Sequence, residues 1–477
     1  MMKTLFLNPP SFDGFDGGAG SRYQARREIR SFWYPTWLAQ PAAMIPDSKL
    51  IDAPARGLKL ADIEAVIGDY ELAILHTSTP SFGNDVKIAE ALKAKNPKLK
   101  IGMVGAHVAV NPEPSASASR AIDFVARSEF DYTIKEIASG KPLAEVLGIS
   151  YVADGKVVHT PERPIIMNMD ELPSVIDVYK RDLRIEDYFI GYLEHPYISF
   201  YTGRGCKSRC TFCLWPQTIG GHKYRTRSPE VVAAEVAKVK EYFPQVKEVF
   251  FDDDTFTDDL PRAEATAKLL GKLGVTWSCN AKANVPYETL KVLRDNGLRL
   301  LLVGYESGSQ QILFNIKKGM RVEFARRFTA DCHKLGIKIH GTFIVGLPGE
   351  TKETIQETIK FAKEINPHTM QVSLAAAYPG TKLYEQAKEN NWLREETGAK
   401  GDVVANNGLQ VSSIEYPHLS HEEIFESLAT FYKQFYFRPK KIGEITWEMM
   451  HSWDMTKRRL REGVEFFQFL TQREDRA

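Results

Sequence analysis

Three of the five cysteines lie close together in one short loop. They are Cys206, Cys210 and Cys213, separated by small, polar or basic residues and one aromatic residue. Thiolates at such a spacing can bind an iron-sulfur cluster, but a closed four-iron cluster takes four protein ligands. Three ligands would leave one iron with an open coordination position. A second molecule could bind and react at that iron.

A disulfide framework, a zinc site and unrelated buried thiols are the alternatives to a cluster. A disulfide framework would be unusual, because five cysteines are few for 477 residues and odd in number. A structural zinc ion would need a fourth ligand, which His222 could provide, although such sites usually contain paired cysteines. Three unrelated buried thiols would have no reason to fall in a loop rich in glycine, arginine, lysine and serine.

The motif, with an aromatic residue before its last cysteine, resembles the signature of the radical S-adenosylmethionine (SAM) superfamily. The resemblance implies that Cys206, Cys210 and Cys213 bind a 4Fe-4S cluster and that Phe212 borders the cofactor. It also implies that the open iron chelates SAM, and that one electron cleaves the sulfonium to give a 5'-deoxyadenosyl radical. A reducing partner such as flavodoxin or ferredoxin would supply that electron.

Three carboxylates follow one apolar run. They are Asp252, Asp253 and Asp254. Carboxylates at a strand end would neutralise the ammonium charge of SAM. Asp253 and Asp254 resemble the second-strand motif of the family, so we predict that both bind the cofactor and act in catalysis. A helix N-terminus with acidic neighbours is the structural alternative, and it accounts better for Asp258 and Asp259.

Two later runs carry further cofactor candidates. The run 304–309 places a carboxylate and hydroxyls where a ribose could be held, and the resemblance implies that Glu306 and Ser307 contact the nucleoside. The run 341–350 resembles the G-x-I-x-G-x-x-E pattern of the family. In that pattern, Gly341 and Gly346 would admit the adenine close to the backbone.

Two single residues and two cysteines complete the candidates. Arg225 follows the cysteine loop and is predicted to bind the methionyl carboxylate, the alternative being a solvated turn that caps a helix. His340 could move protons and is predicted to be catalytic, although a lone strand histidine can equally be structural. Cys279 and Cys332 are predicted to be buried apolar thiols.

A strand and helix pattern between residues 197 and 378 must position these groups. Six runs are predicted strands: 197–202, 246–251, 276–281, 299–303, 338–345 and 369–375. Helices fill the gaps, for example residues 229–242, with Ser228 before the helix and Pro229 at its first position. This alternation predicts a partial TIM-like (β/α)6 barrel, whose active site would lie at the carboxyl ends of the strands.

Residues 1–147 also alternate between strands and helices, which predicts a Rossmann-like, doubly wound α/β sheet. Ligands bind such sheets beyond the carboxyl ends of the strands. Three of these ends, the Asn8-Pro9-Pro10 turn, the loop 77–81 and the turn 105–107, resemble the cobalamin-binding domain that precedes the barrel in one subclass of radical SAM enzymes. The residues that the resemblance assigns to cobalamin are Thr77, Ser78, Thr79, Gly105, Ala106 and His107. The alternative is a similar domain that binds nothing.

One histidine motif is not assigned to cobalamin. The segment 331–336 matches the D-x-H-x-x-G pattern by which some cobalamin proteins offer a histidine to cobalt. It lies far from the predicted N-terminal sheet and ends an amphipathic helix that Gly336 would cap. We therefore predict that His333 is structural.

The remaining segments connect and cover the two sheets. Residues 148–196 are predicted to be a linker that contains a hairpin turning at Asp154-Gly155. Residues 379–477 are predicted to be a helical, aromatic-rich region, with a capping box at Ser420. Aromatic residues beside basic ones at 435–441 and 447–453 suit either packing against the barrel mouth or a lipid-facing surface.

The composition excludes some function classes. A balance of 62 basic against 61 acidic residues gives a net charge of +1, so we predict no nucleic-acid partner. The first apolar run is too short for a signal peptide, and no run of about twenty apolar residues could span a bilayer. We predict a cytoplasmic protein, with contact to the cytoplasmic membrane left open.

The order of the domains and the run Cys206 to Gln217 together resemble the hopanoid-biosynthesis-associated radical SAM proteins of the HpnJ family. The resemblance implies a hydrophobic glycosylated lipid as substrate, glucosaminyl bacteriohopanetetrol, whose sugar ring is contracted to a cyclitol ether. A cobalamin-dependent radical SAM methyltransferase is the alternative enzyme. A non-catalytic iron-sulfur or cobalamin redox sensor is the alternative from another class, and it would need neither the carboxylates after the second strand nor Glu306.

Overall fold

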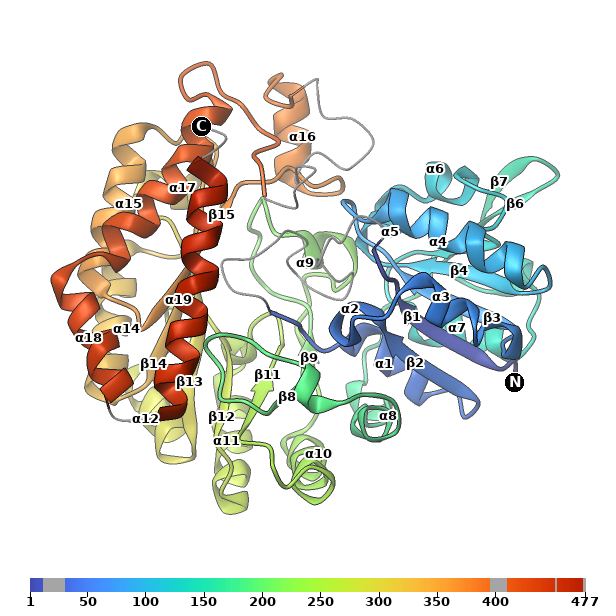
Figure 1. Cartoon of the computed structure of the whole chain (residues 1–477), viewed down its shortest axis with the longest axis horizontal. Coiled ribbons are helices and arrows are strands. Elements are labelled where there is room, and N and C mark those ends of the chain that lie inside the picture. Colours follow the sequence, from blue (N-terminus) through green and yellow to red (C-terminus); the bar gives the residue numbers. More distant parts are fainter. Residues whose placement is uncertain (12–30, 395–409, 451–452, 475–477) are drawn as a thin grey trace.

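Two large sheets organise the part of the chain that the computed structural model describes, residues 1–11, 31–394, 410–450 and 453–474. Figure 1 shows the N-terminal sheet on the right, the second sheet nearer the centre, and the C-terminal helices on the left, with α18 at the far left. The predicted fold class is confirmed: an N-terminal doubly wound sheet, a partial barrel and a helical C-terminal region.

The N-terminal sheet has seven strands in the order β2-β1-β3-β4-β5-β6-β7. The strands are β1 (Thr4–Asn8), β2 (Ser48–Asp52), β3 (Leu72–His76), β4 (Lys100–Val104), β5 (Phe124–Ala126), β6 (Ile149–Ala153) and β7 (Lys156–His159). The first five are parallel, and the strand order reverses between β1 and β3, where doubly wound folds bind ligands. The hairpin predicted for the linker is β6–β7, and it extends this sheet beyond residue 147.

Helices cover both faces of this sheet. They are α1 (Thr36–Ala43), α2 (Ala53–Arg56), α3 (Leu60–Glu64), α4 (Phe82–Lys95), α5 (Ala106–Val110), α6 (Pro112–Ser117) and α7 (Asp131–Ala138). Because both faces are covered, β1 is buried along its whole length. Leu5 and Leu7 belong to the core of one face, and Phe6 belongs to the core of the other.

The second sheet is the predicted partial barrel. Its six parallel strands are β8 (Tyr197–Phe200), β11 (Glu248–Phe251), β12 (Trp277–Ala281), β13 (Leu298–Glu306), β14 (Lys338–Val345) and β15 (Thr369–Leu374), ordered β8-β11-β12-β13-β14-β15. A short antiparallel ribbon of β9 (Gly203–Arg204) and β10 (Arg225–Thr226) lies on either side of the cysteine loop in sequence. Each predicted strand overlaps an observed one.

Helices connect or follow these strands, and the helix from Pro229 begins at the predicted residue. They are α9 (Leu214–Thr218), α10 (Pro229–Tyr242), α11 (Leu260–Leu273), α12 (Tyr287–Asp295), α13 (Gln310–Asn315), α14 (Val322–Lys334), α15 (Lys352–Ile365) and α16 (Lys382–Glu389), with α8 (Ile176–Asp182) in the connecting segment. The Ser228 side chain accepts a hydrogen bond from Val231 N–H, so it caps α10 as predicted. Cys279 on β12 and Cys332 on α14 are fully buried, also as predicted.

The two sheets share one hydrophobic core. Tyr34, just before α1, stacks on Tyr188 with ring centroids 4.0 Å apart and donates a hydrogen bond to the Tyr197 carbonyl on β8. Trp37 on α1 packs against Phe130 of the N-terminal domain and Tyr201 of the barrel. The aromatic rings around α1 therefore fix the N-terminal domain against the first barrel strand.

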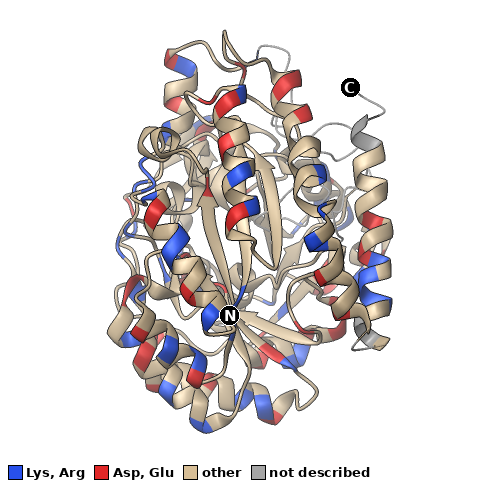
Figure 2. Cartoon of the chain, turned by 90° about the vertical axis from the view of Figure 1, so that its left-hand side faces the viewer, with Lys and Arg blue, Asp and Glu red and all other residues tan. Residues whose placement is uncertain are grey.

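Three helices form the described C-terminal part: α17 (His421–Tyr436), α18 (Pro439–Met450) and α19 (Trp453–Glu474). Ser420 and Glu423 make the predicted capping box of α17. Figure 2 shows basic and acidic residues interspersed along the outer helices of the barrel. None of the helices in the described ranges combines the length and the apolar content that crossing a membrane requires.

Candidate active site

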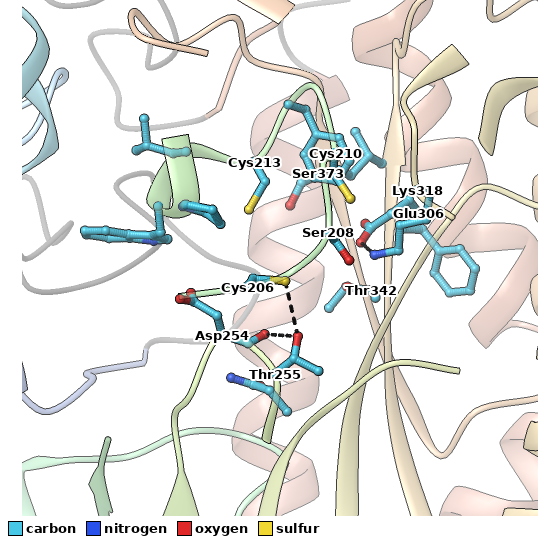
Figure 3. A pocket seen from close by; sticks show the side chains of 18 of the residues that line it. Cys206, Ser208, Cys210, Cys213, Asp254, Thr255, Glu306, Lys318, Thr342 and Ser373 are labelled. Carbon is cyan, nitrogen blue, oxygen red and sulfur yellow. Dashed lines mark hydrogen bonds and ion pairs between the residues drawn. The ribbon is translucent and has the colours of Figure 1, made fainter. Parts of the chain in front are cut away.

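A cavity of about 310 Å³ lies at the carboxyl ends of the barrel strands. All three cysteines of the loop line it, together with side chains that follow β11, end β13 and lie on β14 and β15. Figure 3 shows the sulfur atoms of Cys206, Cys210 and Cys213 around this space. Parallel strands bring their carboxyl ends to one edge, which is why residues far apart in the sequence meet here.

The donor set fits the expected cluster. All three thiols are free of disulfides and border one cavity, and Cys206 Sγ lies 3.7 Å from Thr255 Oγ1. His222, the fourth ligand of the zinc alternative, does not line the cavity. Its Nδ1 lies 2.9 Å from the Ser208 carbonyl oxygen and 3.3 Å from that of Cys206, so it holds the loop backbone. When bound, a cluster with one open iron supplies a place for SAM and an electron to cleave it.

Gln217 on α9 holds the cysteine loop in shape. Its Nε2 donates to the carbonyl oxygens of Cys213 at 2.8 Å, Thr211 at 3.2 Å and Cys210 at 3.3 Å. Its Oε1 accepts a hydrogen bond from the backbone N–H of Lys382 at 2.9 Å. One side chain therefore joins three loop carbonyls to the start of α16. No pattern in the sequence predicts this role, because a glutamine four residues after a cysteine carries no local signal.

We expect Gln217→Leu to impair cluster retention. The leucine keeps the approximate size but leaves loop carbonyls without their donor, at a cost of about 1–3 kcal/mol for a buried acceptor. Iron per chain after anaerobic gel filtration should be lower than in wild type. The iron content of Gln217→Glu should fall by a similar amount, because an ionised glutamate can accept hydrogen bonds but cannot donate them. Full iron retention in both variants would show that the loop does not need this clamp.

A buried ion pair faces the cysteines across the cavity. Lys318 Nζ lies 2.6 Å from Glu306 Oε1, and both side chains line the cavity. Figure 3 shows this pair on one side of the space and Asp254 on the other. Burial by itself would lower the pKa of Lys318, but the charge and hydrogen bond of Glu306, together with Cys210 and Cys213, raise it and keep the ammonium group protonated. The cavity therefore offers charges of both signs, as an amino acid with an ammonium and a carboxylate requires.

Lys318 is absent from the residues that the sequence predicts for the site. It lies in the loop between α13 and α14, which packs on the cysteine loop because Thr211 N–H donates to the Ile316 carbonyl. Glu306 itself has a left-handed backbone, with φ of 63°, at the end of β13. The ion pair joins the end of β13 to the loop between α13 and α14, a contact that no spacing in the sequence reveals.

The structure separates the two predicted carboxylates. Asp254 lines the cavity, and its Oδ2 accepts a hydrogen bond from Gly205 N–H in the cysteine loop. Asp253 is fully buried and does not line the cavity. Its carboxylate accepts hydrogen bonds from Thr202 N–H, the Thr202 hydroxyl and the Tyr224 hydroxyl. This corrects the prediction for Asp253, whose contacts position the ends of β8 and β11.

Three further predicted cofactor residues lie outside the cavity. Ser307 is buried against Thr358 on α15, with the hydroxyl oxygens 3.0 Å apart. At Gly341 a Cβ would lie 3.3 Å from Pro367 and Tyr305. Gly346 has φ of 87° and lies against Ile424, so its lack of a side chain serves a turn covered by α17. Thr342, Phe343 and Ile344, from the same motif, line the cavity instead.

Glu350 closes the turn that contains Gly346. It is fully buried, and its Oε2 accepts hydrogen bonds from the backbone N–H groups of Gly346 and Leu347. Burial raises the pKa of this carboxyl group from 4.5 to about 8, and the two hydrogen bonds only partly oppose the shift. Glu350 is therefore largely protonated at neutral pH in the folded protein.

The raised pKa of Glu350 predicts that the unfolding free energy depends on pH, and that Glu350→Gln removes this dependence. Its folded pKa is raised, so its contribution to stability is complete below about pH 4.5 and is lost as pH rises through about 8. In that window the unfolding free energy should fall by up to about 1.4 kcal/mol per pH unit relative to Glu350→Gln. Urea denaturation of both proteins from pH 5 to 8 measures the difference, and parallel curves would contradict it.

Arg225 does not reach the cavity. It is 3% exposed, and its two terminal nitrogens pair with both oxygens of Glu129, each at 2.8 Å. Beside it, Arg204 makes two contacts with Asp131, at 2.6 and 3.1 Å. The structure thus corrects the predicted contact with the methionyl carboxylate. The four side chains form an interdomain ion-pair network that joins the β9–β10 ribbon to the N-terminal domain.

His340 lies elsewhere in the barrel. Its Nδ1 is 2.8 Å from Thr369 Oγ1, and its ring stacks on Tyr192 with centroids 4.0 Å apart. It borders a second cavity and not the one with the cysteines. The prediction of a catalytic role beside the cofactor is corrected, because His340 is nearer the start of β14 than its carboxyl end.

The loops predicted for cobalamin meet at the ends of β3 and β4. At Gly105 a Cβ would lie 2.1 Å from the Thr77 carbonyl oxygen, so only glycine lets the loops approach this closely. The Ser78 and Ser81 hydroxyls are 2.8 Å apart, and Thr79 Oγ1 lies 3.2 Å from His107 Nδ1. Burial lowers the pKa of His107 to about 4, which leaves its imidazole neutral.

These loops lie next to a helix that contacts the barrel. Helix α5, which contains Ala106 and His107, packs on α9, and α9 begins directly after Cys213. Figure 1 shows α9 between the two sheets. The hydroxyl groups at these strand ends suit the amide groups of a corrinoid. His333 of the D-x-H-x-x-G match is on α14, with Nε2 3.0 Å from the Ile365 carbonyl oxygen, a structural contact as predicted.

A family model and several known proteins match this chain. Residues 200–362 match the model of the radical SAM superfamily. A Pyrococcus horikoshii protein named an uncharacterized methyltransferase is 31% identical over 97% of this chain and 98% of its own. The anaerobic magnesium-protoporphyrin IX monomethyl ester cyclase of Rubrivivax gelatinosus is 26% identical over 81% of this chain and 70% of its own.

Two solved structures share the fold. The cobalamin-dependent SAM radical enzyme OxsB, with aqua-cobalamin and SAM bound, has a TM-score of 0.70 and 16% identity, over 97% of this chain and 72% of its own. The radical SAM methyltransferase TsrM of Kitasatospora setae has a TM-score of 0.64 and 14% identity, over 92% of this chain and 90% of its own. With the near full-length relative from Pyrococcus and the matched domain, these findings show that the chain belongs to the radical SAM superfamily.

Proposed function

We propose that this radical SAM enzyme is a cobalamin-dependent methyltransferase. The observation that carries the proposal is the cavity in which three free thiols face Asp254 and the Glu306–Lys318 pair. The near full-length relative named as a methyltransferase supports methyl transfer, as does the fold shared with the methyltransferase TsrM, and the fold shared with OxsB supports the use of cobalamin. The cobalamin would lie at the loops 77–79 and 105–107 of the N-terminal domain.

The residues of this chain would act by binding and orientation. Cys206, Cys210 and Cys213 would hold the cluster, and the carboxylate of Asp254 would accept hydrogen bonds from the SAM ammonium group. Lys318 would pair with the SAM carboxylate while its charge is balanced by Glu306. The apolar wall at Phe343 and Ile344 would exclude water from the radical. The electron would come from a partner such as flavodoxin or ferredoxin.

Product analysis tests the proposal without the natural substrate. Protein purified without oxygen should contain iron, sulfide and cobalt, and under strong reduction it should convert SAM to S-adenosylhomocysteine as well as 5'-deoxyadenosine. Methyl donation gives the first product and radical cleavage gives the second. Protein that has been loaded with cobalamin and still yields 5'-deoxyadenosine alone would contradict methyl transfer.

Ring contraction of a glycosylated lipid, implied by the resemblance to the hopanoid proteins, stays a second candidate. It would consume SAM through 5'-deoxyadenosine alone and leave the substrate without an added methylene. Mass spectrometry of the converted lipid separates the two reactions. A redox sensor would produce neither product catalytically, and it would be insensitive to Glu306→Gln.

A further inference from the structure

A second cavity of about 300 Å³ lies toward the amino ends of β14 and β15. It is bordered by these two strands, the C-terminal helices α17 to α19 and the segment before β8. Most of its lining is aromatic or aliphatic, including Trp33, Tyr432, Tyr436 and Phe466. Its volume is about twice that of an apolar cavity of ~150 Å³ that can hold benzene. The cavity is therefore large enough for a substantial apolar group.

The two cavities follow the same face of the same strands. Alternate residues of a strand share a face. On β15, Gln371 lines both cavities and Ser373 lines only the cysteine cavity, while on β14 His340 lines the second cavity and Thr342 the first. Residues two apart on a strand are separated by about 7 Å. A single molecule could thus extend from one cavity into the other past Gln371.

The charged side chains that line the second cavity, Arg459 and Glu462, are already paired. Arg459 Nη1 lies 2.9 Å from Glu462 and its Nη2 2.8 Å from Glu448. His368 Nδ1 accepts a hydrogen bond from Ile339 N–H at 3.1 Å. A charged ligand would therefore have to break existing pairs, whereas an apolar group would not. Burial of apolar surface is therefore the interaction that this cavity offers.

The mouth of the second cavity is also apolar. Phe437, Ile442 and Phe467 line it and are 46%, 50% and 59% exposed. Large apolar side chains are rarely grouped on a surface without a function. Here they continue an internal cavity outward, so an apolar molecule could enter from this side.

We infer that the second cavity binds the apolar end of an amphipathic substrate whose polar end reaches the cysteine cavity past Gln371. The inference names a substrate class for the reaction proposed above and rests on it for the chemistry. The binding itself depends only on the described cavity. The aromatic side chains of α17 to α19 thus bind the substrate as well as pack against the barrel.

Two glycines on neighbouring helices supply a matched test. Gly463 on α19 lines the cavity, and a Cβ placed there meets no atom within 4 Å. Gly443 on α18 is equally open but does not line the cavity. Phenylalanine at either position replaces a poor helix former. Only Gly463→Phe would place a ring in the cavity, so Gly443→Phe is its control.

The probe is the neutral fluorophore N-phenyl-1-naphthylamine, titrated into the full-length protein purified without oxygen. Wild type and Gly443→Phe should show the same saturable fluorescence increase, and Gly463→Phe should weaken the affinity at least tenfold. Thr446→Phe, at the cavity rim, should weaken the affinity for the fluorophore less than Gly463→Phe does. Circular dichroism checks that each variant is folded.

Three outcomes would overturn the inference: no saturable binding by wild type, equal binding by all variants, or equal loss in Gly463→Phe and Gly443→Phe. Equal binding would mean that the probe binds the exposed surface of α18 and α19. The titration needs neither SAM nor reductant. If the titration gives the expected result but no S-adenosylhomocysteine forms, only the proposed function is rejected. If S-adenosylhomocysteine forms but the titration does not give the expected result, only the second-cavity site is rejected.

Discussion

Cys213→Ala should remove the iron-sulfur cluster and with it all reductive cleavage of SAM. The three thiols line one cavity, and the fourth position of the cluster has no cysteine of the described chain near it, since Cys279 and Cys332 are buried elsewhere. Two thiolates do not hold a four-iron cluster. Iron per chain should fall from about four to background, and 5'-deoxyadenosine should fall below detection. Iron analysis and liquid chromatography measure both.

Cys332→Ala is the matched control for this experiment. Cys332 is a fully buried thiol on α14 and does not line the cysteine cavity. Its removal leaves a small cavity, which should lower the unfolding free energy by about 1 kcal/mol without lowering the iron content. Equal iron contents in Cys213→Ala and Cys332→Ala would reject the ligand assignment.

Glu129→Gln should destabilise the protein strongly and loosen the cysteine loop. Glu129 is 2% exposed and makes two contacts of 2.8 Å with Arg225, which is 3% exposed. The variant leaves a buried guanidinium without its full countercharge, and breaking a buried pair in this way costs about 3–5 kcal/mol. Urea denaturation should show this loss. Iron retention should fall too, because Arg225 begins the strand that pairs with β9, next to the cysteine loop.

Asp295→Asn is the control for Glu129→Gln. Asp295 pairs with Lys291 on the surface of α12, where the two side chains are 56% and 51% exposed. Solvent-exposed pairs contribute little, so stability and iron content should stay close to wild type. If both variants shift the urea midpoint equally, the interdomain ion-pair network does not have the role assigned to it.

Local patterns in the sequence were sufficient for the architecture. The predicted strand 338–345 coincides with β14, and the predicted helix 229–242 coincides with α10. Both predictions are confirmed because apolar runs, N-caps and prolines influence the conformation of residues close to them in the sequence, whatever the overall fold. The hairpin at Asp154-Gly155 was also found, but its membership in the N-terminal sheet depends on pairing with β5, which no local signal specifies.

Within the candidate site, the sequence alone determined which thiols come together, because Cys206, Cys210 and Cys213 are held in one loop by the chain itself. Only the tertiary structure decided between Asp253 and Asp254, since adjacent residues at a strand end point to opposite sides and a shift of one residue exchanges them. The same holds for Lys318, Gln217 and Glu129, each of which has a partner in a distant element or in the other domain. Such contacts depend on how separate elements pack, so their residues carry no periodic or spacing signal by which the sequence could have identified them.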